Sequence, residues 1–312
     1  MKKMLCCAMV MAVMLGSCSR NASREQSSEA MMELLNQAYK QGEWETTLMY
    51  LDSLQKMNIG GNLLAIEAEC YIGLGNYDKA IGILQSEIDS AEIENIHYLY
   101  NTLGVAYFYK GESDRAAEMY KKAIEFRPTY ARPYIHLANL YEQSNNKEAS
   151  ISYFMDAVKL FAENEFYDEV VEFTSRVLDM DSTNIEALKF QQYALFTTGE
   201  YEYALSIGGY LDELLENAKQ WNDRYVNWLF TGLSAFRCGE YELARDLIGN
   251  AMKSLEVAEV YGWLGHCYLS AIFTKQGNAV AAEAAMNAAK EIDKEGVGEF
   301  IEELVAYKVS EE

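Results

Sequence analysis

The residue types that most often carry catalysis or bind metals are few in this chain and far apart. Its three histidines, His97, His136 and His266, have no cysteine or carboxylate at the spacing that zinc sites use. The sequence also lacks the short motifs that are typical of nucleotide-binding loops, serine hydrolases and zinc proteases. We therefore predict a protein that is not an enzyme and that has no catalytic residue, no metal and no cofactor.

One cysteine stands where it could be chemically modified. Lys2 and Lys3 precede an uncharged, mostly apolar run over residues 4–15, which is too short to span a bilayer and suits a signal peptide. The run ends in Leu-Gly-Ser-Cys, and these four residues resemble the lipobox of bacterial lipoproteins. The resemblance implies that residues 1–17 are removed and that the thiol of Cys18 accepts the lipid. A plain secretory signal is the alternative.

The residues after this cysteine are small and polar. We expect the segment 18–29 to be a flexible tether. In the usual sorting rule for such lipoproteins, a serine after the lipid-bearing cysteine, here Ser19, favours the outer membrane. The resemblance therefore implies a lipid-anchored protein of the bacterial outer membrane that faces the periplasm or the cell surface.

The charge balance excludes some partners. The chain has 48 acidic and 26 basic side chains, a formal net charge of −22. This opposes binding to nucleic acid, which needs a Lys- and Arg-rich surface. Three further cysteines, Cys70, Cys238 and Cys267, lie within apolar helical patterns, so we expect small buried hydrophobic residues. A Cys238–Cys267 disulfide is the alternative.

A short motif recurs along the chain. It reads GEYEYA from Gly199 and GEYELA from Gly239, with looser copies from Gly42, Gly75 and Gly111. Recurrence at intervals of about 33 to 40 residues is typical of a repeat array. Each copy has a glycine, then an acid, an aromatic residue and a small residue. This order indicates a turn that is followed directly by the start of a helix.

The clearest copy spans Tyr100–Pro128 and resembles the tetratricopeptide repeat. The family pattern is matched by Tyr100, Leu103, Gly104, Tyr107, Gly111, Ala116, Tyr120, Ala123 and Pro128. These positions fall three or four apart on one face of each of two helices, and Pro128 would stop the second helix. A hairpin of this kind exposes apolar surface that only the next hairpin covers, so the copies must stack.

The sequence thus predicts an all-α fold, a superhelix of about seven helical hairpins with a capping helix over Val297–Ser310. One place breaks the alternation: helices are expected over 147–164 and 167–181. The first of these is either shared between two repeats, or a helix has been lost. We place a division there, with an N-terminal array over 30–164 and a C-terminal array, including the capping helix, over 165–312.

The first helix of each hairpin should line the concave face, so its polar residues are candidates to bind a partner. The resulting strip combines aromatic, amide and guanidinium groups that can pair with the backbone of an extended peptide. Its members are Tyr98, Asn101, Tyr109, Arg132, Asn139 and Gln143. Ordinary exposed polar residues are the alternative. A second, weaker strip comprises Asn222, Arg224, Asn227, Trp228 and Arg237.

The carboxylate clamp that some related repeats use is rejected. Only Arg132 resembles a clamp residue, and the other clamp positions carry Ala65, Glu69 and Thr102. The predicted function is a non-catalytic scaffold or adaptor of the bacterial cell envelope, with a protein or extended peptide in its groove. The alternative is a glycan- or nutrient-binding accessory lipoprotein of a surface uptake complex.

Overall fold

The computed structural model describes residues 29–56, 63–90, 95–293 and 296–298. Every regular element in these residues is a helix, which confirms the all-α prediction. None of the described helices is both long and apolar enough to cross a membrane. The predicted signal peptide, Cys18 and the tether up to residue 28 lie outside the described residues. So does most of the predicted capping helix, although Val297 is described and is buried.

The described residues form two compact units, and the division between them falls between Ser144 and Asn145. The first unit begins with a helix over residues 29–40 and continues with α2 (Trp44–Lys56), α3 (Leu64–Gly73), α4 (Tyr77–Ser90), α5 (Ile96–Lys110), α6 (Ser113–Phe126) and α7 (Ala131–Gln143). The second unit contains α8 (Lys147–Glu163), α9 (Tyr167–Met180), α10 (Ile185–Thr197), α11 (Tyr201–Ala218), α12 (Trp221–Arg237), α13 (Tyr241–Ala251), α14 (Leu255–Lys275) and α15 (Ala279–Ile292).

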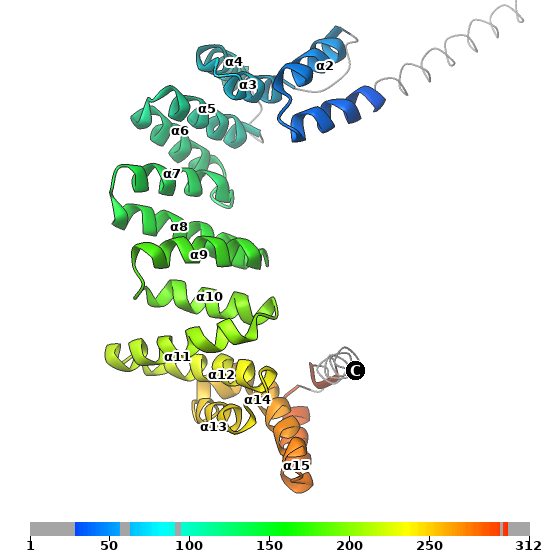
Figure 1. The fold of residues 1–312 in the computed structure, drawn as a ribbon, viewed down its shortest axis with the longest axis vertical. Coiled ribbons are helices and arrows are strands. Elements are labelled where there is room, and N and C mark those ends of the chain that lie inside the picture. The colour runs from blue at the N-terminus through cyan, green and yellow to red at the C-terminus, as the bar shows by residue number, and fades with distance from the viewer. Residues whose placement is uncertain (1–28, 57–62, 91–94, 294–295, 299–312) are drawn as a thin grey trace, which may run out of the picture. The chain divides into compact units, whose positions relative to one another are not determined.

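Within each unit, consecutive helices pack side by side as hairpins (Figure 1). The first helices of successive hairpins also touch one another: α3 contacts α5, and α5 contacts α7. The same holds in the second unit for α8, α10, α12 and α14. First helices therefore form one continuous face in each unit, as the repeat pattern predicts.

The recurring glycine has the turn geometry that explains the repeated motif. Gly111 ends α5 with φ of 87°, and Gly199 and Gly239 have φ of 88° and 83°. Residues other than glycine rarely adopt this left-handed conformation, which closes a helix and lets the next one start. The repetition in the sequence is thus a repetition of hairpin turns.

Close contact within a hairpin depends on small residues. Gly104 of α5 faces Tyr120 of α6, and a β-carbon at Gly104 would lie 2.5 Å from the Tyr120 ring. Tyr120 is 1% exposed, and Ala116 and Ala123 on the same helix are fully buried. The large ring therefore fills the space that the glycine leaves open.

The break in the alternation falls at α7 and α8. In the second unit α8 pairs with α9 and touches α10, so it takes the place of a first helix. The first unit then ends with α7, and the described residues contain seven hairpins besides this helix. The division falls after Ser144 and not after Asn164 as predicted, because α8 packs with the helices that follow it.

The three described cysteines are free thiols, which excludes the alternative Cys238–Cys267 disulfide. Cys70 and Cys267 are fully buried, as expected, whereas Cys238 is only partly buried. Burial raises the pKa of the Cys70 thiol to about 12 and that of Cys267 to about 11. Such thiols stay protonated at neutral pH and act as small apolar residues.

Candidate functional site

The first unit contains a cavity of about 480 Å³ on the face made by its first helices. The helix over residues 29–40, α3, α5 and α7 each contribute to its wall, and so do the starts of α2 and α4. Its lining residues are Tyr39, Trp44, Glu69, Ile72, Gly73, Tyr77, Asn101, Thr102, Val105, Tyr109, Arg132 and His136. The volume lies in the range of ligand-binding pockets.

A carboxylate is held in place in this wall by two hydroxyl groups. Tyr98 of α5 donates a hydrogen bond to Oε1 of Glu69 at 2.5 Å, and Tyr39 donates to Oε2 of the same residue. Burial and then the hydrogen bond to Glu69 raise the pKa of both tyrosines, so both hydroxyls remain protonated and donate. Three successive first helices thereby fix the position of one acceptor group.

A second acceptor has no donor among the described residues. Asn101 of α5 is 5% exposed, and its Oδ1 atom is buried without a hydrogen-bond partner in the described structure. Its neighbour Thr102 is satisfied, because the Thr102 hydroxyl donates to the carbonyl of Tyr98 at 3.0 Å. A buried acceptor without a donor costs about 1–3 kcal/mol of folding stability. Most buried acceptors in proteins have a donor, so the Oδ1 atom of Asn101 is an exception in the wall of this cavity.

Helix α7 brings one charged and one neutral group to the cavity. Arg132 is exposed, whereas His136 is partly buried and stacks on Tyr120 with ring centroids 5.0 Å apart. Burial, followed by the positive charge of Arg132, lowers the pKa of His136 to about 4. The imidazole is therefore uncharged at neutral pH, and Arg132 is the one permanent cation among the described lining residues.

Aromatic rings form much of the remaining wall. Tyr39 meets the edge of Trp44 at a centroid distance of 5.9 Å, and Tyr77 stacks on Tyr109 at 6.3 Å. Gly73 lets the indole approach, because a β-carbon there would lie 2.4 Å from the Trp44 ring. The cavity thus combines flat apolar surfaces with a few fixed polar groups, as ligand sites commonly do.

The structure brings together four of the six residues predicted to bind a partner. Asn101, Tyr109 and Arg132 line the cavity, and Tyr98 holds Glu69 in its wall. Asn139 and Gln143 lie on α7 but are not among the lining residues, and their role stays a prediction.

Sequence reasoning missed Glu69, Tyr39, Trp44 and Tyr77. In the sequence, Glu69 stands at a clamp position that a carboxylate does not fit. The aromatic residues stand at positions that the repeat normally uses for packing. A carboxylate on an otherwise apolar helix, LAIEAECYIG, was the available signal.

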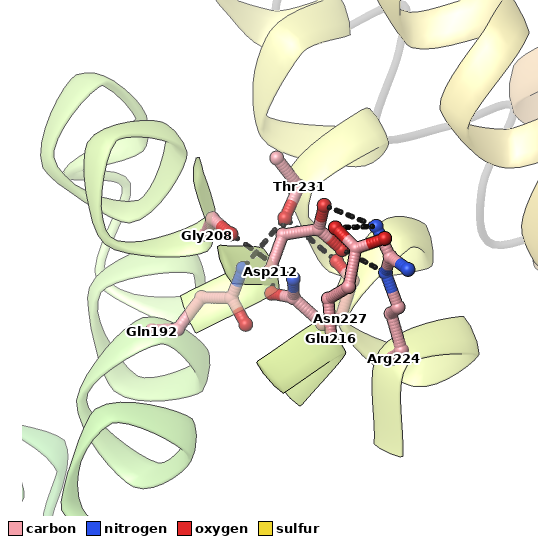
Figure 2. Close-up of polar contacts among 7 residues, drawn as sticks. All are labelled: Gln192, Gly208, Asp212, Glu216, Arg224, Asn227 and Thr231. Carbon is pink, nitrogen blue, oxygen red and sulfur yellow. Dashed lines mark hydrogen bonds and ion pairs between the residues drawn. The ribbon is translucent and has the colours of Figure 1, made fainter. Parts of the chain in front are cut away.

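The second predicted strip is occupied by contacts within the second unit (Figure 2). Arg224 donates to both carboxylate oxygens of Asp212, at 2.7 and 3.0 Å, and to Glu216 at 3.2 Å. Asn227 is buried and donates to the carbonyl of Gly208 at 3.0 Å. The prediction that Arg224 and Asn227 belong to a free binding surface is therefore wrong. Groups of α11 already accept hydrogen bonds from both side chains.

The other two large members of that strip also have internal partners. Arg237 donates to the Tyr268 hydroxyl at 3.1 Å, and Trp228 packs against the core of the second unit. Asn222 is exposed.

The second unit has a cavity of its own, about 450 Å³, with mainly apolar walls. Tyr193 and Phe230 meet edge to face at 5.3 Å, and Tyr261 approaches Phe230 at 5.7 Å. Lys189 and Asp223 also line it and pair with each other at 2.6 Å. The charges near this cavity neutralise one another, in contrast to the exposed Arg132 and fixed Glu69 of the first unit.

No cluster of three or more histidine, cysteine, aspartate or glutamate side chains within the described ranges could hold a metal ion.

Two family models match the chain: one described as TPR repeat over residues 104–145, and one as tetratricopeptide repeat over residues 131–164. The second match treats α7 and α8 as one repeat, although α8 also pairs with α9. The contacts place α8 with α9 and α10, which favours the second of the two predicted alternatives, the loss of a helix after α7.

Curated relatives match parts of the chain. The BBSome complex member BBS4 of Bos taurus is 30% identical over 138 residues, which cover 44% of this chain and 22% of the relative. The TPR repeat-containing protein MJ1428 of Methanocaldococcus jannaschii is 27% identical over 183 residues, which cover 57% of this chain and 28% of the relative. The chain thus spans about a quarter of the length of these relatives.

Comparison with solved structures gives matches of low identity. The C-terminal part of a TPR repeat-containing protein from Cytophaga hutchinsonii is 15% identical, with a TM-score of 0.36. The match covers 84% of this chain and 95% of that one.

Proposed function

Because this chain is a tetratricopeptide-repeat protein, we propose that it is a non-catalytic scaffold that holds a protein partner at the bacterial cell envelope. Proteins built from these repeats bind other proteins through the face that their stacked helices form. The envelope location follows from the lipobox-like residues that end at Cys18, and the attachment is a lipid on that cysteine.

The observation that carries the scaffold proposal is the composition of the cavity in the first unit. Side chains from four consecutive first helices meet there, and they include aromatic rings, a carboxylate, an amide and a guanidinium group. An extended segment of a partner that follows this face could place a side chain in the cavity while its backbone pairs with neighbouring polar groups. The bovine relative is by name a member of a protein complex, which agrees with this proposal.

Partner capture provides the first test. Replacing Arg132 and Tyr109 with alanine should weaken capture about 30-fold, or about 2 kcal/mol, because arginine and tyrosine are the residues that most often dominate interfaces. Both side chains are exposed, so the helices should remain folded. The measurement is crosslinking in intact cells, followed by identification and quantification of the adducts.

The matched control is Lys121→Ala, which removes an exposed charge from α6, a second helix that does not line the cavity. Adducts of one or two proteins that fall in the double variant and persist in the control would support the proposal. If the wild-type chain crosslinks to no protein, the scaffold function is wrong. Titration with soluble oligosaccharides tests the glycan-binding alternative, and we expect no heat of binding.

The anchor is tested separately. The Cys18→Ser variant should move from the membrane fraction to the soluble fraction, because a hydroxyl cannot accept the thioether-linked lipid. The control Cys6→Ala changes a cysteine within the proposed signal peptide and should leave the protein in the membrane fraction. Fractionation combined with metabolic labelling by a radioactive fatty acid measures both effects. Retention of label in Cys18→Ser would show that the anchor is elsewhere.

A further inference from the structure

The cavity of the first unit offers hydrogen-bond acceptors that the described protein does not use fully. A carboxylate has about four lone-pair sites, and Glu69 uses one on each oxygen for Tyr39 and Tyr98. The Oδ1 atom of Asn101, in a residue that is 5% exposed and lines the same cavity, accepts no hydrogen bond from the described residues. The Glu69 oxygens can take a further proton donor from a ligand, whereas the buried Asn101 oxygen can do so only after its amide turns toward the cavity.

We infer that this cavity binds a lysine or arginine side chain of the partner. The inference rests on the proposed function and specifies the chemistry of the segment that is bound. An ammonium or guanidinium group is a charged N–H donor, so it can pair with the Glu69 carboxylate. An acidic side chain would be repelled by Glu69 and would leave the buried Asn101 acceptor without a donor.

The walls suit the same ligand. The rings of Tyr39, Trp44, Tyr77 and Tyr109 line the cavity, and the faces of such rings attract cations. The aliphatic stem of a lysine or arginine would pack on these rings while its head group reaches the acceptors. An apolar side chain could use the rings alone, but it would cover the charge of the Glu69 carboxylate without a cation to pair with it.

The positive charges around the cavity do not prevent a lysine or arginine side chain from binding there. His136 is uncharged at neutral pH, and Arg132 is the one permanent cation among the described lining residues. Arg132 is exposed, so water and salt screen its repulsion of a second cation. Its donors can pair with backbone carbonyls of the same partner segment. Over longer distances, the net charge of −22 attracts a basic segment.

The test is selection from a library of random octapeptides displayed on phage, with the full mature chain as the target. The wild-type chain should enrich peptides with lysine or arginine at one fixed position. The Glu69→Gln variant keeps one of the two acceptor oxygens and removes the charge, so it should bind the selected peptides at least tenfold more weakly. The control Glu67→Gln makes the same change in charge two residues away on α3, outside the cavity lining, and should bind as the wild type does.

Synthetic versions of the selected peptides test whether the positive charge itself is responsible for binding. Replacing the fixed arginine by citrulline, or the fixed lysine by norleucine, should reduce binding at least tenfold in the wild type and little in Glu69→Gln. The chain has four tryptophans, and the indole N–H signal of Trp44 should shift on peptide binding in a nuclear magnetic resonance titration. The Trp44→Phe variant lacks this signal, so a comparison of the two spectra identifies it.

Three results would overturn the inference. Selection of peptides without a fixed basic residue, equal binding by Glu69→Gln and wild type, or equal binding of the citrulline peptide would each show that the cavity does not recognise a cation. Any of these can occur while crosslinking still returns a protein partner, and the scaffold function would then stand. If crosslinking returns none, the proposed function fails independently of the peptide results.

Discussion

Replacing Gly104 with leucine should destabilise the first unit by about 3 kcal/mol, the upper end of the usual range for overpacked cores. A β-carbon at this position would lie 2.5 Å from Cε1 and 2.6 Å from Cδ1 of Tyr120, which is 1% exposed and cannot turn outward. The hairpin of α5 and α6 must therefore open. Because Tyr120 stacks on His136, the change should also disturb the cavity and lower partner capture.

Hydrogen exchange measured by mass spectrometry is the suitable readout, because it reports each unit separately. Exchange should rise in α5 and α6 and remain unchanged in α12 and α14. The control Gly82→Ala lies on α4, where a β-carbon meets nothing within 4 Å, and it should stabilise the unit by about 0.4–1 kcal/mol. A Gly104→Leu chain with wild-type exchange would contradict the packing described for this hairpin.

Two adjacent glycines on α11 should respond to the same substitution in opposite directions. Gly208→Ala should destabilise the second unit by about 2–3 kcal/mol, because its β-carbon would lie 2.1 Å from Oγ1 of Thr231 and 2.5 Å from Nε2 of Gln192. These atoms are themselves hydrogen-bonded at 2.9 Å (Figure 2). Separation of α11 from α12 would also break the bond from Asn227 to the Gly208 carbonyl, which leaves buried polar groups unpaired.

Gly209→Ala is the matched control. Gly209 is exposed and a β-carbon there meets nothing within 4 Å, so the loss of backbone freedom in the unfolded chain should stabilise the unit by about 0.4–1 kcal/mol. Urea unfolding followed by circular dichroism, with hydrogen exchange of α11 and α12, measures both variants. If Gly208→Ala and Gly209→Ala changed the free energy of unfolding equally, the hydrogen bonds among Gln192, Thr231 and Asn227 would not depend on the absence of a side chain at Gly208.

The two units offer cavities of different chemistry. Among the described residues, the cavity of the first unit contains a carboxylate, an amide oxygen without a donor and a guanidinium group, whereas the charged Lys189 and Asp223 of the apolar second cavity pair with each other. Fixed, partly unsatisfied polar groups give a site specificity for a particular ligand. For this reason the proposed recognition of a basic side chain concerns the first unit.

The fold could be predicted from the sequence because the signals that determine it are local. The spacing of Tyr100, Leu103 and Tyr107 defines one face of a helix, and Gly111 ends that helix in a left-handed turn. Such signals act over three to ten residues and recur with every repeat. The hairpins follow from them directly, whereas the contact of Gly104 with the Tyr120 ring is a finding of the structure.

The exception is α8, where the local pattern fitted two positions in the repeat equally well. Only its packing with α9 and α10 assigned it to the second unit and moved the division from Asn164 to Ser144.

The candidate site could be predicted only in part, because which polar groups remain available depends on contacts between distant residues. Tyr98 and Tyr39 lie 29 and 30 positions from Glu69, and no local pattern indicates that they hold its carboxylate. Arg224 looked equally available in the sequence, yet Asp212 of the preceding helix already binds it. The sequence by itself determined the hairpins and the face that they share, since these arise from short-range helix periodicity and turns. The tertiary structure alone decided which side chains on that face are satisfied by neighbours and which remain free for a partner, since helix packing brings together residues from different repeats.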